Sequence, residues 1–339
     1  MKKAATIEDI ARKTGVSKST VSRALGGSTR ISASTRRRIL AAAGRLHYEP
    51  NYLARGLSRS KTLSIGVILE DIMNPFFTEV ATGIEKTLSA AGYSMLLTSS
   101  GYVPETELEL TRTLLRNKVD GVLITPVAMD SPSVRLLEAR KVPFFVMNDK
   151  SQGGDSNWID SDNFAGGYMA AEYLLKLGHR RFLILRDLAL HGTRDRFDGV
   201  CKALDDRKIA SADRVILDGA ATRQHGRDLV DGFLAENGSR MPTAVLATND
   251  LVAIGVLEGL FAHGIRVPEA VSLIGYDDVY IAGMLRVPLT TIHQAKYRMG
   301  QIAATGLLRI LDGTQKSGGQ QFLIKPRLII RESCKEPAR

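Results

Sequence analysis

The fold of the N-terminal part follows from one stretch, Thr6-Ile-Glu-Asp-Ile-Ala-Arg-Lys-Thr-Gly-Val-Ser-Lys-Ser-Thr-Val-Ser-Arg-Ala-Leu25. Thr6 can cap a first helix, in which apolar residues at positions 7, 10 and 11 form one face. Gly15 ends this helix, and Ser17 can cap a second helix over residues 18–25. A third helix is predicted from about Ser34 to His47, before Pro50 breaks the chain. The stretch therefore predicts a small all-α unit built around a helix-turn-helix.

Charge is distributed unevenly along the chain. The net charge is +10, but residues 1–61 hold 14 Lys and Arg against three Asp and Glu, whereas the remainder holds 32 against 33. A basic module joined to a nearly neutral one is the electrostatic pattern of binding to a phosphate backbone. A solvated basic tail would lack the apolar periodicity that this segment has, so we expect residues 1–50 to bind double-stranded DNA.

The second helix supplies the residues that would read the DNA. A helix-turn-helix places its second helix in the major groove, where small and polar residues allow close approach. Arg23 can make a bidentate contact with guanine, and its polar neighbours can reach base edges or phosphates. The alternative is an ordinary helical hairpin with a solvated basic face, which the charge distribution disfavours. The predicted DNA-contacting residues of this unit are Thr6, Ser17, Lys18, Ser19, Thr20, Ser22, Arg23 and Arg30.

After Lys61 the pattern changes to apolar strands that alternate with amphipathic helices. Such alternation is typical of parallel α/β sheets, and the number of strands favours two of them. The expected fold class is therefore a small all-α helix-turn-helix headpiece plus an α/β domain with two parallel sheets. The predicted strands are Leu63–Leu69, Ser94–Thr98, Gly121–Thr125, Phe144–Met147, Phe182–Leu185, Val215–Leu217, Ala244–Ala247 and Val271–Gly275.

Several function classes lack their signatures. No apolar run approaches the roughly 18 residues of a membrane span, and no export signal opens the chain. The two cysteines, Cys201 and Cys334, are expected to be reduced thiols of a cytoplasmic protein. No Gly-x-Gly-x-x-Gly, phosphate-binding loop, metal-ligand spacing of the six histidines, or nucleophile–base set occurs. We therefore expect no enzyme activity, no catalytic residue, no metal and no cofactor.

Taken together, the motifs closely resemble the lactose repressor/galactose repressor family of bacterial transcription regulators over nearly the whole chain. Each motif alone is weak, but their combination in this order is specific to the family. The residues that carry the resemblance are Thr6-Ile-Glu-Asp-Ile-Ala, Gly15-Val-Ser, Thr20-Val-Ser-Arg, Thr35-Arg-Arg-Arg-Ile, Tyr48-Glu-Pro-Asn51, Ile65-Gly-Val, Asn74-Pro-Phe-Phe77, Leu177-Gly-His-Arg180, Asn249-Asp250, Gly275-Tyr-Asp-Asp278 and Leu289-Thr-Thr291.

The resemblance implies a division into a headpiece at 1–50, a hinge helix and linker at 51–61, and an effector-binding and dimerisation domain at 62–339. Its two lobes, similar to those of periplasmic sugar-binding proteins, would comprise about 62–162 with 293–323, and about 163–291 with 324–339. The hinge would fold on DNA, with Asn51, Ala54 and Leu57 in the minor groove and Leu57 as a wedge. Eight residues with Gly56 among them are too few to be helical alone. The alternative is a flexible linker.

Ligands of open α/β sheets lie beyond the carboxyl ends of the strands, so polar residues just after the strands are candidates for an effector site. Several have a structural alternative. Phe76 and Phe77 could belong to the core, Trp158 could pack between lobes, and Asp250 could cap a helix. Arg196 could instead pair at the surface with an adjacent aspartate. The predicted effector-binding residues are Asp71, Asn74, Phe76, Phe77, Asp149, Trp158, Arg196, Asn249, Asp277 and Gln294.

Three loops depart from the family pattern. The loop after Phe182–Leu185 is not Gly-Pro-rich, the usual Pro after Gln294 is absent, and the segment after Asp149 is not generic. Lys150, His191 and Lys296 lie in or near these loops and make an anionic ligand conceivable. The expected function is a repressor that acts as a homodimer or dimer of dimers on a near-palindromic operator, under control of a sugar or sugar derivative. The alternative is a solute-binding receptor without a regulatory role, which would not need residues 1–60.

Overall fold

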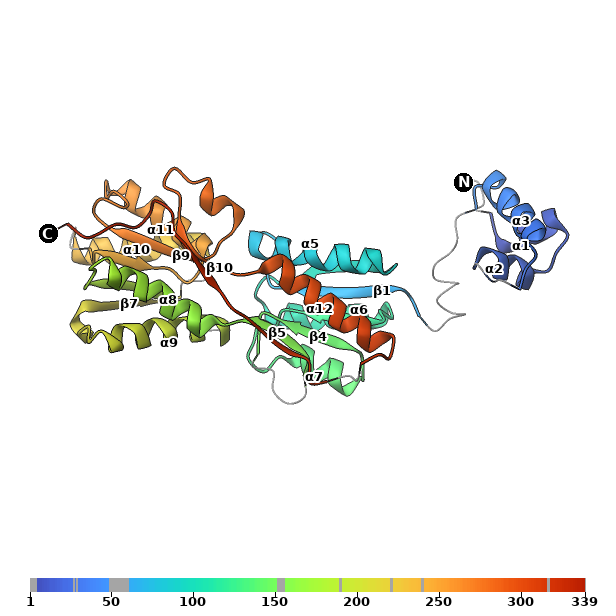
Figure 1. Ribbon diagram of the computed structural model, residues 1–339, viewed down its shortest axis with the longest axis horizontal. Helices are drawn as coiled ribbons and strands as arrows, with labels where there is room; N and C mark the ends of the chain where they lie inside the picture. The colour runs from blue at the N-terminus through green and yellow to red at the C-terminus, as the bar shows by residue number, and fades with distance from the viewer. Residues whose placement is uncertain are drawn as a thin grey trace. The chain divides into compact units, whose positions relative to one another are not determined.

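The computed structural model describes residues 5–26, 28, 30–48, 61–150, 156–188, 191–219, 222–238, 241–315 and 318–338. The chain divides into two compact units, Met1–Thr62 and Leu63–Arg339 (Figure 1). The predicted hinge residues Asn51, Ala54 and Leu57 lie outside the described residues. Within the described residues, no helix is long and apolar enough to cross a membrane.

The first unit contains three helices, α1 (Ile7–Thr14), α2 (Lys18–Leu25) and α3 (Ala33–Arg45). They pack around Ile10, Val21 and Ile39, whose side chains are completely buried. Thr6 closes a capping box with Asp9 at the start of α1, and Gly15 ends the helix in the left-handed conformation, with φ of 66°. The third helix ends two residues before the predicted His47.

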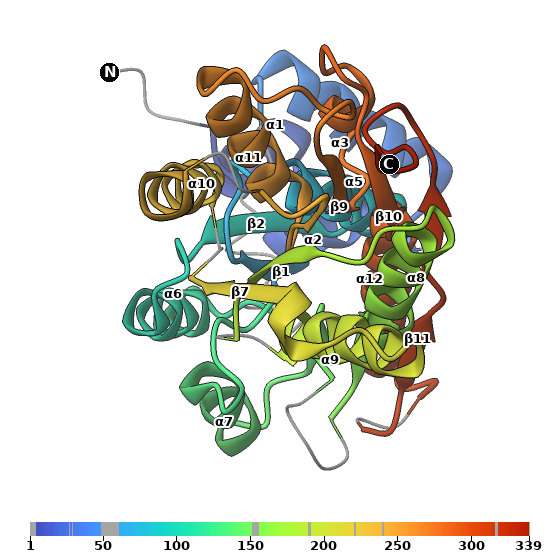
Figure 2. The ribbon, with the colours of Figure 1, turned by 90° about the vertical axis from the view of Figure 1, so that its left-hand side faces the viewer.

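The second unit contains two six-stranded sheets, each of which forms the centre of one lobe. The first sheet has the order β11-β5-β4-β3-β1-β2, and all of its strand pairs are parallel. Helices α5 and α12 cover one face, and α6 and α7 cover the other (Figure 2). The bounds in this lobe are β1 (Ser64–Leu69), α5 (Pro75–Ala90), β2 (Ser94–Ser99), α6 (Pro104–Arg116), β3 (Gly121–Ile124), α7 (Pro132–Ala139), β4 (Phe144–Met147), β5 (Trp158–Ser161), α12 (Lys296–Leu311) and β11 (Gln321–Ile324).

The second sheet has the order β12-β10-β9-β8-β6-β7 and lies between the pairs α8–α9 and α10–α11 (Figure 1). Strand β12 is antiparallel to β10, so this sheet is not wholly parallel as predicted. The bounds are α8 (Asn163–Lys176), β6 (Phe182–Arg186), α9 (His191–Asp206), η1 (Ser211–Asp213), β7 (Arg214–Asp218), α10 (Arg223–Asn237), β8 (Ala244–Leu246), α11 (Asp250–Ala262), β9 (Ser272–Asp277), η2 (Tyr280–Gly283), β10 (Thr290–His293) and β12 (Arg327–Ile329).

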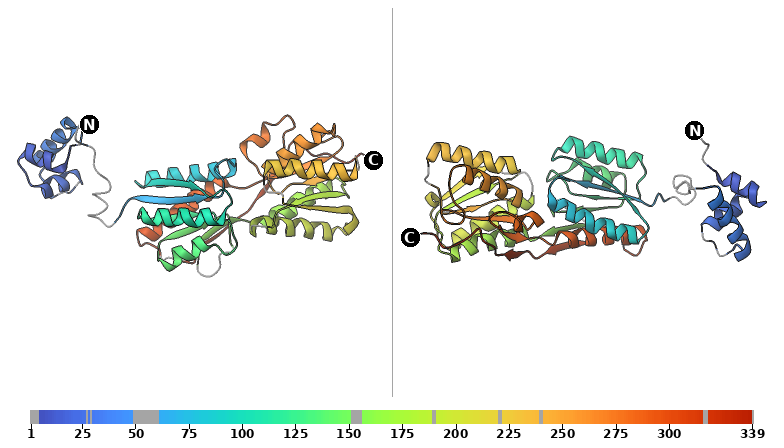
Figure 3. Two further views of the ribbon diagram at one scale, coloured as in Figure 1. Left: turned by 180° about the vertical axis from the view of Figure 1, so that it is seen from behind. Right: turned by 90° about the horizontal axis from the view of Figure 1, so that it is seen from above.

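The chain crosses between the lobes three times, after β5, after β10 and after β11 (Figure 3). The strands beside these crossings are short, and the sequence did not predict β5, β10, β11 or β12. Because the crossings join the two sheets at the carboxyl end of the first, polar residues of both lobes are brought to one place.

Helices α5 and α12 approach each other unusually closely. A Cβ atom added at Gly83 would lie 2.1 Å from the carbonyl oxygen of Tyr297, and one at Gly300 would lie 2.1 Å from that of Val80. No larger residue fits at either position without moving a helix. This packing fixes the start of α12 to the body of the first lobe.

Candidate functional site

Helix α2 presents one apolar and one polar face. Val21 and Ala24 are buried in the core of the first unit, whereas Lys18, Ser22 and Arg23 are exposed. The exposed face carries the residues that we predicted to contact DNA. Its side chains are therefore accessible to a groove, as the helix-turn-helix geometry requires.

Hydroxyl groups at the start of α2 fix its N-terminus. The Oγ of Ser17 accepts a hydrogen bond from the backbone nitrogen of Thr20 at 3.2 Å and lies 2.8 Å from the hydroxyl oxygens of both Ser19 and Thr20. Lys18 pairs with Glu8 of α1, with 2.7 Å between Nζ and Oε1. Ser17 and Thr20 thus have a capping role, and Lys18 is tied to the first helix.

The two remaining predicted DNA contacts of this unit lie outside α2. Thr6 caps α1, and its backbone nitrogen donates to the carboxylate of Asp9 at 3.0 Å. Arg30 is exposed, and its backbone nitrogen donates to Ser28. Both positions lie at helix boundaries, where chain and DNA backbone commonly meet.

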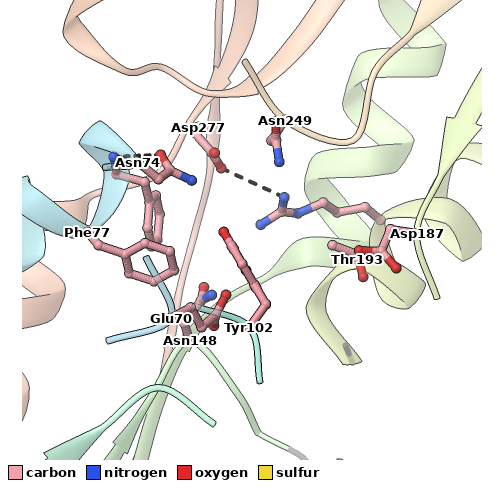
Figure 4. A pocket seen from close by; sticks show the side chains of 11 residues that line it. Glu70, Asn74, Phe77, Tyr102, Asn148, Asp187, Thr193, Asn249 and Asp277 are labelled. Atoms are coloured by element: carbon pink, nitrogen blue, oxygen red, sulfur yellow. Dashed lines mark hydrogen bonds and ion pairs between the residues drawn. The ribbon is translucent and has the colours of Figure 1, made fainter. Parts of the chain in front are cut away.

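A pocket lies between the two lobes of the second unit (Figure 4). It encloses about 460 Å³ when its opening to solvent is included. The first lobe contributes residues that follow β1, β2 and β4 and those that begin α5, and the second contributes residues after β6 and β8, in α9 and at the end of β9. The lining residues are Glu70, Asn74, Phe76, Phe77, Tyr102, Asn148, Asp187, Thr193, Arg196, Asn249 and Asp277.

Arg196 of α9 is 9% exposed and has several fixed partners. Its Nε donates to Oδ1 of Asn163 at 2.8 Å, and its Nη1 donates to the carbonyl oxygen of Thr248 at 2.9 Å. The guanidinium lies 3.9 Å from the centre of the Tyr276 ring, and its Nη1 is 3.7 Å from Oδ1 of Asp277. Arg196 is therefore a buried pocket residue, and the surface pairing that we considered is wrong.

Asp277 ends β9 with its carboxylate at the pocket. Its Oδ1 accepts a hydrogen bond from Nε2 of Gln294 at 2.7 Å. Burial raises the pKa of Asp277, and the charge of Arg196 opposes that effect. Gln294 is completely buried and does not line the pocket; it supports Asp277 from behind.

Asn249 and Asp250 have separate roles. Asn249 caps α11, because its Oδ1 accepts from the backbone nitrogen of Val252 at 2.8 Å, and it also lines the pocket. Asp250 neither caps the helix nor lines the pocket. Its oxygens accept from the hydroxyl of Thr291 at 2.6 Å and from the backbone nitrogen of Val279 at 2.8 Å. Burial and the charge of Asp277 raise the pKa of Asp250 well above its usual value.

The aromatic wall comes from the start of α5. Asn74 caps this helix by accepting from the backbone nitrogen of Phe76 at 3.0 Å. The rings of Phe76 and Phe77 are 5.0 Å apart and nearly perpendicular, and each residue is 2% exposed. Both belong to the core and both line the pocket, so the two roles that we considered are compatible. Tyr102 reaches in from the opposite side (Figure 4), and burial raises its pKa.

Besides Gln294, three predicted residues lie outside the lining. Asp71 is half-exposed, and its Oδ1 accepts from the backbone nitrogen of Met73 at 2.8 Å. Asp149 is buried beside the pocket but does not line it. Trp158, on β5, packs against a core cluster that includes Phe144. In place of Asp71 and Asp149, the residue that precedes each of them in the sequence lines the pocket.

Those preceding residues, Glu70 and Asn148, were missed by sequence reasoning. Glu70 is 3% exposed, and burial raises its pKa well above the usual value. Among the described residues, Oδ1 of Asn148 is buried without a hydrogen-bond partner, so one acceptor at the pocket is unsatisfied. Tyr102, Asp187 and Thr193 were also missed; the first two lie in loops that follow strands, and Thr193 lies in the first turn of α9.

The cations that suggested an anionic ligand have other partners. Lys150 pairs with Asp195, with 2.5 Å between Nζ and Oδ2, and His191 lies 3.3 Å from the same carboxylate. Lys296 is 1% exposed and donates to backbone carbonyls. None of these three side chains lines the pocket. The lining itself holds three carboxyl groups and one arginine.

Comparison with known proteins places this geometry in a family. Residues 6–51 match the model described as bacterial regulatory proteins, lacI family, and residues 171–334 match a periplasmic binding protein-like domain. An HTH-type transcriptional repressor PurR of Haemophilus influenzae (strain PittEE) is 34% identical over 98% of this chain and 99% of its own.

Solved structures are also similar to this chain. The lac repressor dimer bound to operator and the anti-inducer ONPF is 27% identical, with a TM-score of 0.87 over 98% of this chain and 100% of that chain. A LacI family regulator of Enterococcus faecium with bound ribose is 30% identical, with a TM-score of 0.73 over 81% of this chain and 100% of its own. The chain therefore belongs to the lacI family of bacterial regulatory proteins, as a DNA-binding transcription repressor with a small-molecule effector pocket and not as an enzyme.

Proposed function

We propose that this repressor binds a near-palindromic operator as a dimer and that a neutral, hydroxyl-rich small molecule between its lobes controls operator binding. The observation that carries the proposal is the pocket at the strand ends, in which residues of both lobes converge on one space. A ligand that contacts both lobes binds their two arrangements with different affinity, and this difference is what couples it to DNA. The repressor would act in the cytoplasm, where its DNA is.

The chemistry of the lining supports a neutral sugar. Asp277, Glu70 and the unpartnered Oδ1 of Asn148 are acceptors for ligand hydroxyls, and Asn249 and Arg196 are donors. Phe76 and Phe77 offer an apolar wall for the carbon-bound face of a ring. Two similar regulators, from Enterococcus faecium and Enterococcus faecalis, were solved with bound ribose. A phosphate or carboxylate group on the ligand would have to lie among the carboxyl groups of Glu70, Asp187 and Asp277.

Exposed apolar residues support the dimer. Leu96 and Leu97 of the edge strand β2 are 37% and 41% exposed, and Tyr280 and Met284 in the second lobe are 61% and 76% exposed. Large apolar side chains with this exposure mark surfaces that associate. The lac repressor, similar over nearly the whole chain, is a dimer on its operator. A helix-turn-helix dimer reads two half-sites, so the operator would be near-palindromic.

A thermal-shift experiment tests the ligand class. D-ribose, D-ribose 5-phosphate and D-ribonate are each added to the full chain, because a ligand that binds only the folded state raises the melting temperature. We expect the neutral sugar to raise it and the two anions not to. The Asp277→Asn variant serves as the matched control and should respond less. A response to the anions that exceeds the response to the neutral sugar would contradict the proposed class.

A further inference from the structure

Lys296 is the first residue of α12, just after the chain crosses from the second lobe to the first. Its side chain is 1% exposed, although lysine is rarely buried. The ammonium Nζ donates to the carbonyl oxygens of Asp277 and Asp278, at 2.7 Å each, and lies 3.6 Å from Oε1 of Glu79. The cost of burying this ammonium is therefore offset by two hydrogen bonds and one nearby carboxylate.

The two carbonyls belong to a strained turn. Asp277 has φ of 117° and Asp278 has φ of 55°, so two consecutive residues with side chains adopt left-handed backbone conformations. Residues with side chains keep such a backbone conformation only where the surrounding structure holds it. The side chain of Asp278 is held by Nδ1 of His293 at 2.8 Å and Nη2 of Arg331 at 2.6 Å. Lys296 holds the backbone of the same turn.

The backbone of Lys296 is fixed in the first lobe, whereas the turn that its side chain holds belongs to the second lobe. The close approach of α5 and α12 at Gly83 and Gly300 leaves the start of α12 no room to shift. The lysine thus extends from the first lobe to the end of β9 in the second. Because the Lys296 side chain is bonded to both carbonyls, its length determines the position of the turn. The position of the turn then determines where the carboxylate of Asp277 lies in the pocket.

We infer that Lys296 is a positioning residue for effector recognition, which acts through the left-handed turn at Asp277–Asp278 that its buried ammonium holds in place. This inference rests on the proposed function, because it assumes that the pocket around Asp277 binds the effector. Lys296 does not line the pocket, so it acts without touching the ligand. Its effect on ligand affinity should therefore depend on Asp277.

The test compares Lys296→Met with Lys296→Arg and with Lys86→Met, using D-ribose as the titrant on the full chain. Lys86 is the matched control, since it is an exposed lysine of α5 whose Nζ lies 5.5 Å from the Tyr297 ring centre. We expect Lys296→Met to weaken D-ribose binding at least tenfold. Lys296→Arg should recover most of that loss, because its guanidinium can donate to both carbonyls. Lys86→Met should stay within twofold of the unmodified chain.

The dependence on Asp277 separates positioning from general destabilisation. In an Asp277→Asn background, Lys296→Met should weaken D-ribose binding by less than threefold, because the two changes act on one interaction. A full tenfold further loss in that background would overturn the inference. Equally tight D-ribose binding by Lys296→Met and the unmodified chain would also overturn it.

A ligand-free measurement distinguishes this inference from the proposed function. Amide exchange at Val279, whose nitrogen donates to Asp250, should speed up at least tenfold in Lys296→Met, while exchange within α11 stays unchanged. If the unmodified chain binds no D-ribose but this exchange changes, the proposed ligand fails and the positioning role stands. Unchanged exchange at Val279 overturns the positioning role. If Lys296→Met does not fold, Lys296→Gln, which keeps a donor, is tested by the same two readouts.

Discussion

Substitution of Asp160 by asparagine should remove a specific dependence of stability on pH. Asp160 lies on β5, just before the crossing to α8, and is completely buried. Its Oδ1 accepts from the backbone nitrogen of Ser161 at 2.7 Å and from Nδ2 of Asn163 at 3.0 Å. Its Oδ2 has no hydrogen-bond partner among the described residues. Burial raises the pKa of Asp160 from 3.8 to about 7.

The magnitude follows from this pKa difference. Each pKa unit corresponds to about 1.4 kcal/mol, so a rise of about three units corresponds to about 4 kcal/mol between the two protonation states. Because the pKa of Asp160 is raised in the folded state, its contribution to stability is fully present below pH 3.8 and is lost as the pH rises through 7. Asparagine cannot ionise and keeps the oxygen that accepts both hydrogen bonds. Asp160→Asn should therefore be more stable at pH 8 by up to about 4 kcal/mol.

Thermal melts at pH 5, 6, 7 and 8 measure this effect. For a domain of this size, about 4 kcal/mol corresponds to a melting temperature higher by about 8 °C at pH 8, and the gain should shrink steadily toward pH 5. Asp218→Asn is the control. Asp218 pairs with Arg186, and its pKa is lowered by that partner, so its contribution does not change between pH 5 and pH 8. A difference between Asp160→Asn and the unmodified chain that is the same at all four pH values would refute the reasoning.

Three further predictions concern DNA, lobe closure and packing. Arg23→Ala should weaken binding to a selected operator by about 1–3 kcal/mol more than binding to random DNA in fluorescence anisotropy, and equal losses would assign it to a phosphate contact. Lys150→Met removes an ion pair with Asp195 that joins the two lobes, so the affinity for D-ribose should fall about two- to fivefold. A double-mutant cycle with Asp195→Asn that shows zero coupling energy would contradict this prediction. Gly300→Ala places a Cβ 2.1 Å from the Val80 oxygen and should cost about 1–3 kcal/mol, whereas an unchanged melting temperature would show that α5 and α12 can separate.

Local signals explain why the fold was predictable. Helix caps such as Thr6 and Ser17 act within four residues, and the strand β1 is an unbroken apolar run, so neighbouring residues suffice to identify these elements. The short strands β10 and β12 carry no such signal. They depend on pairing between residues far apart in the sequence, such as Thr291 with Ile329. Their existence is a property of the assembled lobe.

The site was predictable in position but not in every residue. Parallel strands bring their carboxyl ends together, and this rule predicted the edge of the sheets at which the pocket lies, while the family resemblance implied that it lies between two lobes. It does not decide which of two adjacent polar residues turns inward, because that depends on backbone torsion at the strand end. Asn148, for example, has φ of 59°, a left-handed conformation that a strand pattern does not anticipate. Lysines 150 and 296 were interpreted as free charges because their partners lie elsewhere in the chain.

The hydrogen bonds of the pocket continue into a crossing between the lobes. Arg196 stands 3.7 Å from Asp277 on the pocket side and bonds Asn163 on the other, and Asn163 bonds Asp160 at the end of β5. A hydroxyl group that binds both Arg196 and Asp277 would therefore act on a guanidinium whose Nε is fixed to Asn163, in the segment that joins the lobes, and whose Nη1 is fixed to Thr248. Such a ligand cannot be equally well bound when that segment changes conformation, because Arg196 would then lose a buried partner. Under the proposed function, differential affinity for two lobe arrangements would thus follow from where Arg196 is anchored, with no separate relay.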